Sequence, residues 1–352
     1  VRGDADAVSL QLDPDARFRI YWPRGFGVQH EAVLAGTVTG WREGDGWRVA
    51  TDALQVRGAG FGLDLRGGMW FQGDGSRPRV DLAANVQPTP LATARGFWIH
   101  NMMSPATVRW LEQALQGGRI ERAHALVSGD LDDWPFRDER RAGRFQVDAR
   151  IADATLKFHP GWPAAEHVDA DVTFLADSFH LDGKGVLDGV GIRSLDAGIE
   201  HFGRAVLDIA AQGGGDAAQL LSLLRNSPLH AVHGDTLDNL RASGLASVTF
   251  GMELPLHADA PPAVVTGTVA LAGAKLADRR WDLAFENVRG RANYGSGGFR
   301  AERLAVRHLG QPGRLSLRAG DYTRDRAQAF EAELQATLAS DGLLRRVGSL
   351  AW

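Results

Sequence analysis

Apolar and polar residues alternate with a period of two along much of this chain, and this pattern constrains the fold more than any other feature. Successive side chains on a β-strand point to opposite faces, so each such segment predicts a strand with one apolar and one polar face. Antiparallel sheets with one wet face have this pattern, whereas buried parallel sheets have continuous apolar runs. The alternating apolar residues include Phe145, Val147, Ile151, Val168, Val172, Phe174, Phe179, Leu181, Val265, Val269, Leu271, Leu283 and Phe285.

Short glycine-containing segments predict the turns between these strands. Glu43–Gly46 lies between two apolar segments and predicts a tight hairpin, because glycine adopts the positive φ angles that such turns require. Asp182–Gly185 and Tyr294–Gly298 have similar compositions and predict further turns, and Gly213–Gly215 predicts a turn before a helix. The expected fold is therefore mainly β, with strands joined by short connections.

Helix signals are few. Ser104 as N-cap and Pro105 at the first helical position predict a helix over 104–118 that ends at Gly117 and Gly118. Asp216 predicts the cap of a second helix near 216–226, and Asp341–Val347 predicts a short C-terminal helix.

The organisation expected from these signals is one continuous elongated body. It comprises a β-rich segment over 1–103, the helix over 104–118, and two further β-rich segments over 119–229 and 230–352. The last two share a weak similarity that aligns 146–157 with 264–275, and any two β-meanders would share part of it.

Composition excludes several classes of protein. The 352 residues include 39 Lys and Arg against 43 Asp and Glu, a net charge of −4, with no basic stripe that would bind nucleic acid. The absence of cysteine excludes disulfides, thiol nucleophiles and thiolate metal sites. The chain contains no stretch of 18 apolar residues, so the sequence predicts no membrane-spanning helix. The abrupt ends, Val1 and Trp352, predict an internal segment of a longer protein.

A search for catalytic and ligand-binding motifs gives none. None of the 11 histidines has a metal-ligand spacing, and His230 and His233 are expected in a loop. Gly213–Gly215 precedes a helix but lacks the Lys-Ser/Thr of a phosphate-binding loop. The acidic residues are scattered over the polar strand faces. We therefore predict no catalytic residue, no metal and no cofactor.

Residue chemistry alone leaves alternatives open. Alternating strands fit a closed core, as in a sandwich or an adhesin-like β-solenoid, as well as an open groove. Ten tryptophans weakly suggest a polysaccharide-active enzyme, which would need two converging carboxylates. Two aromatic–proline clusters, Trp134-Pro135-Phe136 and Trp162-Pro163, predict packing at sheet corners or contact with carbohydrate or lipid.

Several short motifs follow one another in a characteristic order and spacing. They are Trp110-Leu111, Ala114-Leu115, Gly117-Gly118, Ala123, Ala125–Val127, Gly129, Leu131, Trp134–Phe136, Gly143, Phe145, Val147, His159–Ala164, Asp171–Leu175 and Asn226–Leu229. This order and spacing resembles the YhdP family of AsmA-like proteins of Gram-negative bacteria. The resemblance extends over most of the chain and is strongest from about Trp110 to Pro228.

The resemblance implies a bridge-type lipid carrier without catalytic residues. Family members are expected to be periplasmic, anchored in the inner membrane and much longer than this chain, with a long curved β-sheet forming a groove toward the outer membrane. The implied partner is phospholipid, whose movement supports the outer-membrane permeability barrier. Under this hypothesis the alternating apolar residues from Phe145 to Phe285 line the lipid groove, and the two aromatic–proline clusters are packing motifs.

Overall fold

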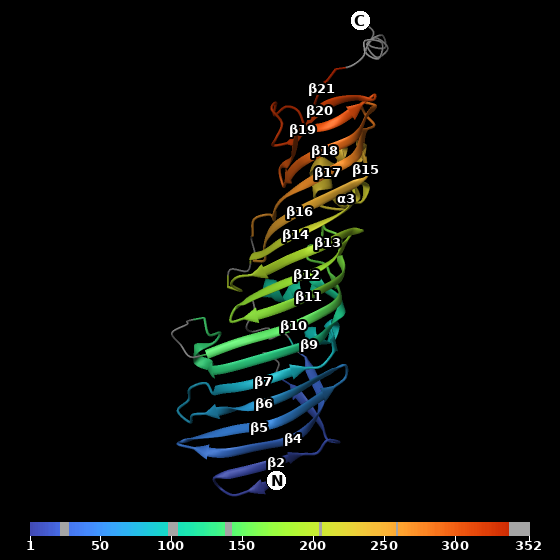
Figure 1. The fold of residues 1–352 in the computed structure, drawn as a ribbon. Coiled ribbons are helices and arrows are strands. Elements are labelled where there is room, and N and C mark those ends of the chain that lie inside the picture. The colour runs from blue at the N-terminus through green and yellow to red at the C-terminus, as the bar shows by residue number, and fades with distance from the viewer. Residues whose placement is uncertain (22–27, 98–104, 138–142, 204–205, 258–259, 338–352) are drawn as a thin grey trace.

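The computed structural model describes residues 1–21, 28–97, 105–137, 143–203, 206–257 and 260–337. Twenty-one strands form a single sheet, and in Figure 1 they are stacked like rungs from β2 at one end to β21 at the other. The strands are β1 Arg2–Gly3, β2 Ala7–Leu12, β3 Arg17–Tyr21, β4 Gln29–Glu43, β5 Gly46–Gly58, β6 Phe61–Phe71, β7 Arg79–Val86, β8 Thr89–Pro90, β9 Leu115–Asp130, β10 Gly143–Leu156, β11 Ala165–Leu175, β12 Ser178–Leu187, β13 Val190–Ile199, β14 Val206–Asp216, β15 Leu240–Ser243, β16 Leu245–Pro255, β17 Val264–Asp278, β18 Leu283–Gly295, β19 Gly298–His308, β20 Gln311–Gly320 and β21 Phe330–Ala336.

The sheet is an antiparallel meander, as the alternation predicts. Each long strand pairs with the next long strand along the chain, from β4–β5 to β20–β21. Three long strands have two consecutive partners on one edge: β2 and β3 pair with β4, β7 and β8 with β9, and β15 and β16 with β17. Such local pairing builds an elongated body rather than a closed sandwich.

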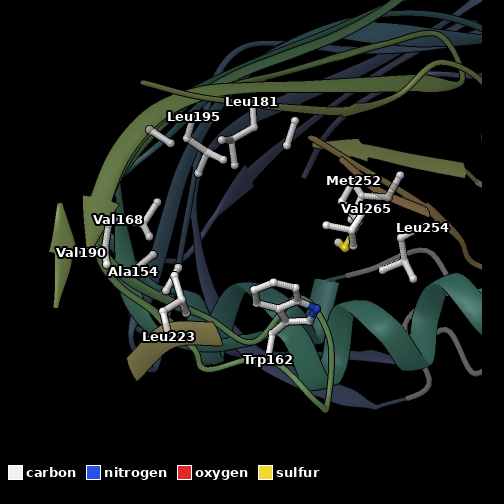
Figure 2. Close-up of a cluster of buried hydrophobic side chains, with 14 of the residues drawn as sticks. Ala154, Trp162, Val168, Leu181, Val190, Leu195, Leu223, Met252, Leu254 and Val265 are labelled. Carbon is white, nitrogen blue, oxygen red and sulfur yellow. The ribbon is translucent and has the colours of Figure 1, made fainter. Parts of the chain in front are cut away.

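A line of β-bulges bends this sheet lengthwise. The pairing register shifts in mid-strand in β4–β5, β5–β6, β9–β10, successive pairs from β10–β11 to β13–β14, and again from β17–β18 to β19–β20. Residues with positive φ lie at these shifts, among them Gly118 (φ 101°), Asp153 (φ 51°) and His167 (φ 51°). A bulge bends its strand and increases the local twist. Bulges aligned across neighbouring strands therefore fold the sheet into a groove, whose bend Figure 2 shows beside Ala154 and Val168.

The turn predictions were right at two positions and wrong at two. At Tyr294–Gly298, Gly295 pairs with Gly298 across a hairpin. Glu43 pairs with Gly46 across a tight hairpin in which Gly44 has φ 64°. Asp182–Gly185 instead lies inside β12 and Gly213–Gly215 inside β14. A Cβ added at Gly183 would lie 2.6 Å from the carbonyl oxygen of Asp169. Glycine there allows two backbones to approach closely within the sheet, which composition alone does not distinguish from a turn.

Four α-helices lie within the described residues: α1 Leu91–Ala94, α2 Pro105–Ala114, α3 Ala217–Arg225 and α4 Leu229–Asn239. A short 3-10 segment, Arg95–Phe97, follows α1, and another, Leu131–Asp133, follows β9. The expected helix at Asp341–Val347 lies outside the described residues.

One helix prediction and one loop prediction need revision. The helix predicted over 104–118 ends at Ala114, and Leu115–Gly118 begins β9, where Gly118 occupies a bulge. The loop predicted around His230 and His233 is wrong, because both residues lie within α4, although His233 (φ −120°, ψ 17°) is not helical and marks a kink in it. The α4 sequence contains Gly234 and has only a weak apolar stripe, so periodicity did not indicate a helix.

The predicted cap of α3 is confirmed. The Asp216 carboxylate accepts a hydrogen bond from the backbone N–H of Ala218 at 2.8 Å, and the Gln219 side-chain oxygen accepts one from the backbone N–H of Asp216 at 3.1 Å. This reciprocal arrangement is a capping box. It directs Leu220 and Leu223 of α3 into the interior of the groove, where both are buried.

Candidate functional site: an apolar groove

The inner face of the bent sheet has a continuous row of apolar side chains that runs across the strands. Each member is the direct cross-strand partner of the next, and the row extends through 12 strands from β4 to β17. In order it comprises Leu34, Val56, Leu63, Val86, Ala123, Ala149, Val172, Leu181, Ala197, Ile209, Met252 and Val265. At about 4.8 Å between strands, the row is roughly 50 Å long.

A second row continues the apolar face to the C-terminal end of the sheet. It contains only apolar, glycine and aromatic residues from β10 to β21. In order these are Ile151, Ala170, Gly183, Leu195, Ala211, Phe250, Gly267, Tyr294, Phe299, Ala319 and Phe330. The two rows overlap from β10 to β17, so an apolar surface extends along the groove from β4 to β21.

The middle of the groove contains a cavity of about 440 Å³. Thr89 is its sole polar lining residue among those the structure describes; the others are apolar residues and one glycine. Its walls come from β6 to β16, and α1 and α2 contribute Leu91, Trp110 and Leu111. A cavity of this size and composition suits an apolar ligand, because Thr89 is the one side chain in the described lining that could replace the hydrogen bonds of a polar ligand.

The opposite face of the same strands is polar and charged. Arg150 and Asp171 are cross-strand partners on β10 and β11, and their side chains form an ion pair at 3.0 Å. The Thr173 hydroxyl donates to the Asp148 carboxylate at 2.9 Å. The two faces of each strand thus differ sharply in polarity, as the alternation predicts.

The structure gathers some of the predicted groove residues at this cavity and places others elsewhere. Val147, Ile151, Val172, Phe174, Phe179 and Leu181 line the cavity. Val168, Val265, Val269 and Leu271 belong to the surrounding apolar cluster or pack against it. Phe285, with Leu283 packed against it, belongs to a second cluster formed by β17–β20, and Phe145 contacts Trp134 at a ring-centroid distance of 4.9 Å.

Several cavity residues were not predicted. They lie on strands that precede or follow the predicted segments, or on the first two helices, and include Phe61, Leu63, Val86, Trp110, Leu111, Ile192, Leu195, Ile199, Leu207, Ile209 and Phe250. The alternation at Leu63 and Leu65 or at Leu207 and Ile209 is the signal that could have identified the strand residues. The helical contributions depend on tertiary folding and have no equivalent signal.

The two aromatic–proline clusters occupy different places. Trp134 packs against Phe145 and Phe136, the peptide bond before Pro135 is cis, and Phe136 is buried. Trp162 is also buried, at 4% exposure, and stands inside the groove in Figure 2, with the half-buried Pro163 after it.

Among the described residues, no helix is both long enough and apolar enough to cross a membrane. Nor do three His, Asp or Glu side chains among them converge in a way that could hold a metal ion. In α4, His230 instead contacts the Asp238 carboxylate at 3.1 Å, and burial lowers the pKa of the His233 imidazole.

Comparison with known proteins gives a consistent set of similarities. The family model described as YhdP protein matches residues 22–351. The intermembrane phospholipid transporter YhdP of Escherichia coli K12 is 25% identical over 302 residues, which cover 82% of this chain. The same alignment covers 23% of that relative, so the chain spans about a quarter of its length. No solved structure matches the chain.

Proposed function

Because the chain belongs to the YhdP protein family, we propose that it is a non-catalytic segment of a lipid carrier that shields phospholipid acyl chains in its apolar groove. The parent protein would be anchored in the inner membrane and cross the periplasm toward the outer membrane. In that place it would support the outer-membrane permeability barrier. The function of the E. coli relative, intermembrane phospholipid transport, supports this proposal.

The observation that most favours the proposal is the uninterrupted apolar row from Leu34 to Val265 together with the cavity beside it. Exposing acyl chains to water costs about 0.8 kcal/mol per CH₂, or roughly 12 kcal/mol for a sixteen-carbon tail. A carrier must offset most of that cost at every position along its path. A row of apolar side chains that repeats with each strand offsets this cost without binding any particular headgroup.

The alternative of a closed-core structural protein, such as an adhesin-like β-solenoid, fits the cavity less well. Protein cores are close-packed and contain few voids larger than a water molecule. Around β17–β20 the second cluster is close-packed at its centre, since Ala274, Val288, Leu304 and Leu315 are each at most 1% exposed. Around β6–β16 the apolar interior instead leaves about 440 Å³ unfilled.

Site-specific photo-crosslinking in the intact parent protein, in cells, tests the proposal. A photoreactive residue at Val147, Val172 or Phe174 should capture phospholipid, because all three line the cavity. Thr173 provides the matched control, since it lies between two of these positions in sequence and on the opposite face. Absence of lipid adducts at all three cavity positions, or equal capture at Thr173, would contradict the proposal.

A further inference from the structure

The loop between β10 and β11 places Trp162 across the groove. Its indole ring lies 5.3 Å from the ring of Phe250, at an interplanar angle of 72°. Phe250 is on β16, and β12, β13 and β14 lie between β11 and β16 in the sheet. Four interstrand spacings correspond to about 19 Å along the sheet. The contact therefore crosses the interior of the groove, as the position of Trp162 in Figure 2 also indicates.

The loop is held in this position from two sides. On one side, the Trp110 indole N–H of α2 donates to the Phe158 carbonyl at 2.8 Å, and the Lys157 backbone N–H donates to the Ala114 carbonyl at 2.7 Å. The Lys157 ammonium also donates to the carbonyl of Trp162. These contacts tie the loop to the helix that contributes to the cavity wall.

On the other side, the loop packs against the junction of α3 and α4. A Cβ added at Gly161 would lie only 2.8 Å from Cγ of Pro228, so glycine allows this close approach. With both sides fixed, the indole of Trp162 is pre-positioned in the groove rather than free to leave it.

Tyr294 is the next aromatic residue after Phe250 along the second row, beyond Gly267. Phe250 and Tyr294 are the cross-strand neighbours of Gly267 on its two sides, and a Cβ on Gly267 would come within 2.3 Å of the tyrosine oxygen. The Tyr294 hydroxyl donates to the Thr249 carbonyl at 2.9 Å, and burial raises the pKa of this phenol. We call Trp162, Phe250 and Tyr294 the aromatic barrier.

The cavity ends at Phe250, the one member of the aromatic barrier among its described lining residues, although the apolar surface does not end there. Phe250 is the last lining residue along the chain, and none comes from β17–β21. Yet the second row continues past the barrier through Phe299 to Phe330. Nothing in the polarity of this row would stop an acyl chain, so the boundary is steric.

We propose that the cavity is an acyl-chain holding site whose C-terminal wall is Phe250, backed by Trp162 and Tyr294, and that Trp162 determines how far along the groove an acyl chain reaches. This inference rests on the proposed function. An acyl chain gains about 0.8 kcal/mol for each CH₂ that it buries, so opening the barrier should draw the chain further along the groove. Passage toward β21 then requires the Trp162 loop to move, or the lipid to leave the groove before it.

Photo-crosslinking on both sides of the barrier in the intact protein tests this proposal. One photoreactive residue replaces Phe179, which lines the cavity, and another replaces Leu317, which packs in the second cluster beyond it. In the otherwise unchanged protein, phospholipid adducts should form at Phe179 and scarcely at Leu317. Trp162→Ala should raise the ratio of Leu317 to Phe179 adducts at least tenfold. Trp134→Ala is the matched control, because Trp134 packs against Phe145 outside the cavity lining, and it should leave the ratio unchanged.

Trp162→Leu guards against loss of folding, because leucine keeps an apolar side chain but cannot span the distance to Phe250. Both Trp162 variants should raise the adduct ratio while the protein retains its β-sheet circular dichroism. Equal adducts at the two positions in the unchanged protein, or a ratio that neither variant changes, would overturn the role of Trp162 while leaving the carrier function standing. Absence of adducts at Phe179 in every variant would overturn the proposed function and this inference with it.

Discussion

Ile209 and Ala210 allow the two faces of one strand to be compared with the same substitution. Ile209 lies on β14 in the first apolar row and lines the cavity, whereas Ala210 is exposed on the opposite face. We predict that Ile209→Asn weakens phospholipid binding and that Ala210→Asn does not. An amide at position 209 would be covered by the acyl chain without a hydrogen-bond partner.

The magnitude follows from the desolvation of that amide. Burying an unpaired polar group costs about 1–3 kcal/mol. Since about 1.4 kcal/mol is a factor of ten in affinity, the dissociation constant should rise roughly 5- to 150-fold. This is a fraction of the roughly 12 kcal/mol available from a sixteen-carbon tail, so binding should weaken without disappearing.

The assay measures the affinity of each variant for a phospholipid with a fluorescent acyl chain. Phospholipid retained per mole of purified protein provides a second measurement, by extraction and mass spectrometry. Ile209 is only half-buried, so the substitution should leave the sheet folded, which circular dichroism checks. Equal affinities for Ile209→Asn and Ala210→Asn, with both proteins folded, would refute the assignment of the lipid to the inner face.

Two further predictions concern the fold that forms the groove. Gly118→Ala should destabilise the protein by about 2–5 kcal/mol in urea unfolding, because φ is 101° and the new Cβ would lie 2.5 Å from Cα of Ala154. Gly44→Ala is the control, at φ 64° with no atom within 4 Å of the new Cβ, and should cost only about 1–2 kcal/mol. Equal costs for the two substitutions would contradict the close packing at the bulge. Asp216→Ala should lower the thermal midpoint of unfolding at pH 7 but not near pH 2. The reason is that hydrogen bonds from backbone N–H groups lower the pKa of Asp216 in the folded state. The stabilisation by this carboxylate is therefore complete above its unfolded-state pKa of about 3.9 and is lost as the pH falls through its folded-state pKa. A loss that does not depend on pH would contradict the capping role.

The strands were predictable because each half-buried strand must alternate, and the pairing of Val172 with Leu181 and of Phe174 with Phe179 follows that alternation. The capped start of α3 was also predictable, because Asp216 follows three glycines and precedes a leucine-rich segment. These signals are local in the sequence. They predict the structure correctly where tertiary contacts favour the same local conformation.

The bend of the sheet and the extent of the groove were not predictable in the same way. Asp153 and His167 adopt positive φ at bulges although neither is glycine, and the His167 Nδ1 lies 2.8 Å from the Asp153 carboxylate across the two strands. Gly183 has the composition of a turn but serves a close contact within a strand. Phe285 has the same alternation as Phe174 yet packs in a different cluster, because alternation assigns a face and not a position along the groove.

A crystal structure of the protein purified with bound phospholipid tests the central claim most directly. We predict elongated acyl-chain density on the inner face, beside Val172, Leu181 and Ile209, with the headgroup outside the apolar lining. This density should end at Trp162. A cavity that is closed by its own side chains, or that contains only ordered water while lipid lies on the charged face, would contradict the account.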